Sequence, residues 1–123
     1  MPEPSLEDCR VLVVEDEYFL AEELREELEV AGATVLGPVG NIPDALGLIE
    51  TSRKIDGAIL DVNLGGELVF PVAERLADES IPFLLATGYD QSVIPGRFAD
   101  VPRCGKPLNI RLVKQAIGKV IHA

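Results

Sequence analysis

Polar side chains stand at the ends of several short apolar runs in this chain of 123 residues. They are two adjacent acids, a third acid, a hydroxyl and a primary amine: Glu15 with Asp16, Asp61, Thr87 and Lys106. Carboxylates bind hard divalent cations, and a metal beside a hydroxyl and an ammonium group fits an incoming phosphoryl group. Phosphoryl transfer depends on positioning and charge neutralisation, and an aspartate can become an acyl phosphate. These residue types therefore indicate phosphoryl chemistry.

The apolar runs predict five strands, each bounded by polar or turn-forming residues. They are Arg10–Glu15, Thr34–Val39, Gly57–Asp61, Pro82–Ala86 and Arg103–Gly105. Helical spacing of apolar residues predicts four helices, which follow Asp16, end near Ser52, cover Val69–Ala77 and follow Asn109. Gly88–Pro102 has weak periodicity, so at most a short helix is expected there. This alternation predicts a parallel sheet with helices on both faces.

The carboxyl ends of the strands meet along one edge of such a sheet, which is where open α/β sheets bind ligands. Two carboxylates ~4 Å apart repel by about 4 kcal/mol at an effective dielectric of about 20, and a third carboxylate adds to this. A cluster of Glu15, Asp16 and Asp61 therefore requires a cation or a retained proton. Oxygen ligands with room for water suit Mg²⁺ or Mn²⁺.

Each of these residues also has an ordinary explanation when it is considered alone. Asp16 could cap the helix that follows it, and Asp61 could be a solvated strand end. Thr87 could be a turn hydroxyl, and Lys106 could be a surface charge. The convergence of acidic, hydroxyl and ammonium groups on one edge of the sheet favours a shared site over separate structural roles.

In this order and spacing the polar residues resemble the site of a response-regulator receiver domain of two-component signalling, and the resemblance covers essentially the whole chain. It implies a flavodoxin-like α/β fold, with a five-stranded parallel sheet of order 2-1-3-4-5 and helices on both faces. It implies that Asp61 accepts a phosphoryl group from a sensor histidine kinase, and that Thr87 and Lys106 hold the phosphoryl oxygens. The Lys106–Pro107 peptide bond would then be cis.

The resemblance also implies a divalent metal, Mg²⁺ or Mn²⁺. Asp16, Asp61 and the backbone carbonyl of Asn63 would bind it, with Glu15 assisting through water. Such a domain is not an enzyme in the ordinary sense, because it catalyses only its own phosphorylation and a slow autodephosphorylation. No output domain follows Ala123, so we expect a stand-alone regulator that acts through a downstream protein of unknown identity.

Three residues depart from the family pattern. Glu15 stands where Asp is usual, Gly65 replaces a common proline, and Arg103 occupies the position of the aromatic switch residue. The sequence Leu85-Ala86-Thr87-Gly88-Tyr89 resembles the motif of the FAT GUY subfamily, which lacks that aromatic residue. This subfamily is associated with kinases of the HWE or HisKA2 type, so a kinase of that type is the expected partner.

Residues 88–102 are the candidate switch segment, because the usual aromatic rotor is absent and this segment adjoins Thr87. We expect phosphorylation to order the segment, which is an established kind of switch. Tyr89 is the candidate side chain for the readout.

Composition and charge exclude several classes of protein. The net charge of −10 disfavours a nucleic-acid binder. No apolar run approaches the ~20 residues that a membrane span requires, and the acidic start carries no secretory signal. We therefore expect a cytoplasmic protein without nucleic-acid or membrane partners. A single domain over residues 1–123 is expected, with residues 1–8 as a flexible N-terminal tail, and Cys9 and Cys104 as free thiols.

The charge is distributed unevenly along the chain. Residues 1–96 contain 5 basic and 20 acidic residues, whereas residues 97–123 contain 6 basic residues and 1 acidic residue. The acidic Glu22–Glu29 face of the first helix is therefore a candidate contact surface for the kinase. The basic residues of the last helix form another: Arg111, Lys114 and Lys119. Alternatively, the two helices neutralise one another.

Three other functions are the alternatives. A small Mg²⁺-dependent phosphatase of haloacid-dehalogenase type needs a second aspartate two residues after the nucleophile, where Asn63 stands. Flavin or nucleotide binding is disfavoured because no glycine-rich loop follows the first strand. A receiver-like module that binds proteins without phosphorylation is the closer alternative, and the complete set of acidic, Thr and Lys residues disfavours it.

Overall fold

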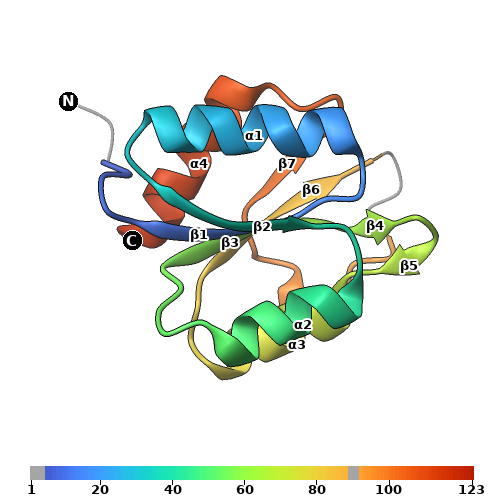
Figure 1. The fold of residues 1–123 in the computed structure, drawn as a ribbon. Coiled ribbons are helices and arrows are strands. Elements are labelled where there is room, and N and C mark those ends of the chain that lie inside the picture. The colour runs from blue at the N-terminus through green and yellow to red at the C-terminus, as the bar shows by residue number, and fades with distance from the viewer. Residues whose placement is uncertain (1–4, 89–91) are drawn as a thin grey trace.

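A computed structural model describes residues 5–88 and 92–123 and contains a five-stranded parallel sheet (Figure 1). In spatial order the strands are β2 (Thr34–Val39), β1 (Arg10–Val14), β3 (Gly57–Asp61), β6 (Phe83–Thr87) and β7 (Arg103–Gly105). Because β6 and β7 are the fourth and fifth strands of this sheet along the chain, the predicted order 2-1-3-4-5 and the flavodoxin-like α/β fold are confirmed. The Gly37–Pro38 interruption lies in β2, which is an edge strand as expected.

Two pairs of helices cover the two faces of the sheet, as Figure 1 shows. One face carries α1 (Tyr18–Val30) and α4 (Ile110–Ile121), and the other carries α2 (Ile42–Thr51) and α3 (Phe70–Asp78). Each face has its own apolar core, with Leu24 and Ile117 on the first and Ile49 and Leu76 on the second. Covered on both sides, β3 and β6 are buried at every position, which explains their continuous apolar sequences.

Asparagine side chains cap two of the helices. Asn41 accepts a hydrogen bond from the Asp44 amide at 2.9 Å, and Asn109 accepts one from the Leu112 amide at 3.2 Å. The alternative explanation of Asp16 as a helix cap is wrong, because α1 begins at Tyr18 and the N-cap residue is Glu17. Asp16 therefore lies one residue before the capping position.

The predicted tail over residues 1–8 is wrong for residues 5–8, which pack against the sheet. Leu6 is 4% exposed and joins the core under α1 and α4. Removing its apolar side chain from water lowers the free energy of the folded state. The Asp8 amide donates to the Gly32 carbonyl at 3.0 Å, and the Ser5 carbonyl lies 2.7 Å from His122 Nε2. Residues 1–4 lie outside the described part of the chain.

Between β3 and α3 the chain forms a small antiparallel hairpin that the sequence did not predict, β4 (Asn63–Leu64) with β5 (Glu67–Leu68). The segment after β6 contains one 3-10 turn among its described residues, η1 (Gly96–Phe98), which agrees with the expectation of at most a short helix. Cys9 and Cys104 are free thiols, as expected. Within residues 5–88 and 92–123, none of the helices has both the length and the apolar character to cross a membrane.

Candidate functional site

Three carboxyl groups converge at the carboxyl edge of the sheet. Glu15 and Asp16 follow β1, and Asp61 is the last residue of the neighbouring strand β3. One oxygen from each lies within 4.8 Å of the others, as the sequence predicts. Glu15 and Asp61 are only 5% and 4% exposed, whereas Asp16 faces solvent. Since water screens the two buried acids poorly, their charges must be balanced within the protein or by a bound cation.

Lys106 supplies part of that balance. Its Nζ lies 2.7 Å from Asp61 Oδ2 and 3.5 Å from Glu15 Oε1. Partial burial opposes the charged ammonium, but the hydrogen bond to Asp61 and the charge of Glu15 outweigh it and raise the pKa of Lys106. The backbone amide of Lys106 donates to the Thr87 carbonyl at 2.7 Å, and the Lys106–Pro107 peptide bond is cis, as the resemblance implies.

Glu15 is held in an unusual state. Burial, and then the adjacent Asp61 carboxyl group, raise the pKa of Glu15 from 4.5 to about 8. Neither of its carboxyl oxygens has a hydrogen-bond partner among the described residues, and only the Lys106 ammonium lies nearby as an ion-pair partner. Buried polar atoms are normally satisfied. A site of unsatisfied carboxylate oxygens beside the exposed Asp16 therefore fits a hard divalent cation with its waters.

Asp61 has a donor on each oxygen. Lys106 Nζ contacts Oδ2, and the backbone amide of Asn63 donates to Oδ1 at 3.1 Å. The Asn63 side chain turns into the hairpin instead, where its Oδ1 accepts from the Gly66 amide at 2.7 Å. Gly65 adopts φ +60°, and a Cβ built on it would lie 3.4 Å from Asp16 Oδ2. The hairpin thus lies against both the Asp61 and the Asp16 sides of the cluster.

Thr87 ends β6, and in the register of the sheet it pairs with Gly105, the residue before Lys106. It is 2% exposed, and its hydroxyl has no hydrogen-bond partner among the described residues. Burial of a hydroxyl without a hydrogen-bond partner costs about 1–3 kcal/mol. A ligand that accepts a hydrogen bond from Thr87 would remove this cost, so the hydroxyl is a donor available to an incoming ligand.

The structure therefore brings Glu15, Asp16, Asp61, Thr87 and Lys106 to one edge of the sheet and places Asn63 beside them. Sequence reasoning missed the hairpin that follows Asp61, for which the glycine pair Gly65-Gly66 was the available signal. It also missed the hydrogen bonds from Arg103 to the carbonyls of Phe98 and Ala99 at η1. Tyr89, the candidate readout residue, lies outside the described residues.

Several solved structures are similar to this chain. SdrG from Sphingomonas melonis Fr1 is 40% identical, with a TM-score of 0.77, and the match covers 94% of this chain and 98% of that one. The BeF3-activated conformation of SdrG from Pseudomonas melonis Fr1 is 41% identical, with a TM-score of 0.74 and coverage of 91% and 95%. A response regulator receiver protein from Sinorhizobium medicae WSM419 has a TM-score of 0.79 at 22% identity, over 97% and 98%. No protein-family profile and no curated protein matches the chain.

Three observations define the class of this protein. They are the fold, the polar residues at one edge of the sheet, and the similarity over almost the whole of both chains. The chain belongs to the response-regulator receiver domains, as the resemblance implies. Within that class it is similar to SdrG, with which it shares two residues in five.

Proposed function

We propose that this receiver domain accepts a phosphoryl group on Asp61 from a histidine kinase, with Mg²⁺ or Mn²⁺ bound in the cluster of Glu15, Asp16 and Asp61. The observation that carries the proposal is the buried Asp61 carboxylate, which has Lys106 Nζ at 2.7 Å and two further acids within 4.8 Å. The BeF3-activated conformation of SdrG supports the proposal. That relative is activated by BeF3, which resembles a phosphoryl group, and it is 41% identical over 91% of this chain.

Asp61, Lys106 and Thr87 would have different roles in the phosphoryl transfer. An Asp61 oxygen forms the new O–P bond while the P–N bond of a phosphohistidine breaks, and the electron pair of that bond stays on the imidazole nitrogen. A bound divalent cation supplies charge neutralisation for the phosphoryl oxygens. Lys106 offers a positive charge on the same side as Asp61 Oδ2, and the Thr87 hydroxyl offers a donor that has no other described partner.

Metal binding draws on specific groups of this chain. Asp16 and Asp61 would be the side-chain ligands, the Asn63 backbone carbonyl a third ligand, and Glu15 a water-mediated partner. The unsatisfied oxygens of Glu15 support this assignment, because the metal-free group keeps its proton to about pH 8 and a nearby cation would stabilise its ionised form.

A small phosphodonor tests the proposal without a kinase. Incubation with Mg²⁺ and acetyl phosphate should add about 80 Da, the mass of one phosphoryl group, to the wild-type chain. The gain should disappear in Asp61→Asn and persist in Asp100→Asn, a matched change at an exposed aspartate. A wild type that never gains this mass would favour the phosphorylation-independent binding module instead.

We further propose that the cognate kinase is of the HWE or HisKA2 type and that the domain belongs to the FAT GUY subfamily. The proposal depends on the sequence Leu85–Tyr89 and on Arg103 at the place of the aromatic switch residue. Rapid phosphotransfer from a purified kinase of this type, but not from kinases of other types, is the expected result. Equal transfer from all types would contradict it.

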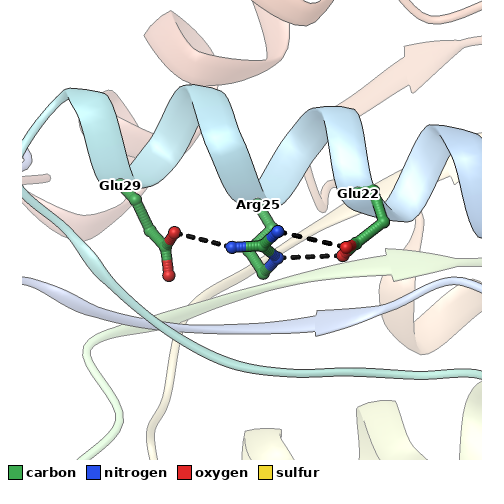
Figure 2. A network of polar contacts seen from close by, with 3 residues as sticks. All are labelled: Glu22, Arg25 and Glu29. Carbon is green, nitrogen blue, oxygen red and sulfur yellow. Dashed lines mark hydrogen bonds and ion pairs between the residues drawn. The ribbon is translucent and has the colours of Figure 1, made fainter.

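The kinase contact surface is proposed on α1 and the connection from β7 to α4. Arg25 pairs with Glu22 at 2.9 Å and Glu29 at 2.8 Å along the α1 surface (Figure 2), so its charge is balanced within the helix. Between α1 and α4, in the part of the chain that the structure describes, the ion pair is Lys114–Glu27 at 3.9 Å. Direct neutralisation between the two helices is therefore limited to this one pair among the described residues.

An apolar feature lies on the same surface. The Phe19 side chain is 80% exposed at the start of α1 and lines a cavity of about 260 Å³ together with Lys106 and Leu108. An aromatic side chain that becomes buried against a partner is frequently the centre of a protein interface. Phe19→Ala should therefore slow phosphotransfer from the kinase and leave phosphorylation by acetyl phosphate unchanged.

A further inference from the structure

Arg103 contacts the described 3-10 turn. It opens β7, three residues before Lys106, and its Nη2 donates to the carbonyl of Ala99 at 2.7 Å and to that of Phe98 at 3.3 Å. These carbonyls lie at the end of η1 and just after it. A planar guanidinium suits this arrangement, because charge-assisted hydrogen bonds to carbonyls at the end of a turn are strong and directional.

The turn is fastened on its other sides as well. The Phe98 ring is 2% exposed, is stacked on Phe70 of α3 with centroids 6.0 Å apart, and meets Phe83 of β6 edge-on at 5.6 Å. Arg97 forms ion pairs with Glu74 and Asp78 of α3. The turn is therefore tied to α3 by Arg97, to the core by Phe98 and to β7 by Arg103.

From these contacts we propose that Arg103 is a static clamp, which holds residues 96–102 in one conformation whether or not Asp61 is phosphorylated. A rotating aromatic residue at this position would move between a buried and an exposed site. Arg103 instead uses its side chain to satisfy carbonyls of the turn. The conformational response to phosphorylation would then arise outside residues 96–102. The candidate switch segment, residues 88–102, would therefore lose its last seven residues.

Three backbone amides report directly on the clamp. The amides of Phe98, Ala99 and Val101 donate within and around the turn, to Pro95, Gly96 and Phe98 at 2.8, 3.1 and 3.1 Å. Local opening of the turn exposes these amides to solvent, so their hydrogen exchange measures how firmly the turn is held.

The first arm of the test needs no metal and no phosphoryl group. Arg103→Met keeps the aliphatic stem but removes the donors, and it should speed exchange at the three amides about tenfold, which corresponds to ~1.4 kcal/mol. Arg103→Lys, which offers a point charge without the planar fork, should fall between Arg103→Met and the wild type. Arg111→Met is the control, because Arg111 is an exposed arginine on α4 and the charge change is the same. Equal exchange in Arg103→Met and Arg111→Met would overturn the clamp.

The second arm uses the wild type with Mg²⁺ and beryllofluoride, and only this arm depends on the proposed function. Resonances next to Asp61 should shift on addition, while exchange at the amides of Phe98, Ala99 and Val101 should stay within twofold of the free protein. A large change at these amides, with resonances next to Asp61 also shifting, would overturn the static clamp. If nothing shifts anywhere, the proposed function fails instead, and the first arm still decides whether the clamp exists.

Discussion

Asp61 and Lys106 form a partly buried ion pair of 2.7 Å, although 45 residues separate them in the chain. Asp61 ends β3, and Lys106 follows β7, two strands away, so the pair crosses the end of β6. The lysine also lies 3.5 Å from Glu15, so one ammonium faces two buried acids. The single ammonium balances only one of these acids, so the metal-free protein keeps a proton on Glu15 to about pH 8, and a bound divalent cation would allow Glu15 to ionise.

Loss of Lys106 tests this balance of charge. In Lys106→Met the two buried acids lose their ammonium, so the unphosphorylated protein should bind Mg²⁺ more tightly and unfold more easily without metal. Removing one partner of a buried ion pair costs about 3–5 kcal/mol, and the partial exposure of Lys106 places this variant at or below the lower end. Isothermal titration with Mg²⁺ measures the first effect and urea unfolding in EDTA the second. Weaker Mg²⁺ binding in the variant would contradict the account.

The pKa of Glu15 predicts a pH dependence of stability. In the unfolded chain Glu15 loses its proton near pH 4.5, whereas in the folded protein it keeps the proton to about pH 8. Between these values the folded state holds the additional proton, so the free energy of unfolding without metal should fall as pH rises. Glu15→Gln should flatten urea-unfolding profiles in this window, whereas Glu67→Gln, at an exposed acid, should not. Parallel profiles for the wild type and Glu15→Gln would refute the prediction.

Thr87→Val should separate stability from function. Valine has nearly the shape of threonine and removes a buried hydroxyl that has no described partner, so the unphosphorylated protein should gain about 1 kcal/mol. The same change removes a donor proposed for the phosphoryl group, so beryllofluoride affinity should fall about tenfold, a typical loss for one charge-assisted hydrogen bond. Thermal unfolding and fluoride-dependent NMR titration measure the two effects. A less stable variant with unchanged beryllofluoride affinity would be contrary to this account.

The hairpin glycines form a matched pair of tests. Gly65 and Gly66 both have positive φ values, +60° and +101°, so alanine strains the backbone at either position by about 1–2 kcal/mol. An added Cβ at Gly65 would lie 3.4 Å from Asp16 Oδ2, whereas one at Gly66 would meet nothing within 4 Å. Gly65→Ala should therefore weaken Mg²⁺ binding more than Gly66→Ala does. Equal Mg²⁺ affinities in the two variants would show that the hairpin does not influence Asp16.

The sequence was sufficient to predict the sheet and the polar edge because both follow from short-range patterns. Gly57–Asp61 is apolar until it ends in a carboxylate, and parallel strands bring such ends together. Contacts between distant segments were not predictable in this way. The docking of Leu6 on the core and the contacts of Arg103 with η1 depend on tertiary packing, and no local periodicity signals them. The Asp16 cap was wrong by a single position, because α1 begins at Tyr18 and its N-cap residue is Glu17.

The position of the phosphoryl group within the chain tests whether Asp61 is the phosphoacceptor. After incubation with Mg²⁺ and acetyl phosphate, borohydride reduces an aspartyl phosphate to homoserine, which peptide sequencing by mass spectrometry can place. Homoserine is expected at position 61, dependent on Mg²⁺ and absent after treatment with EDTA. Homoserine at another aspartate, or none at all in a chain that binds Mg²⁺, would contradict it.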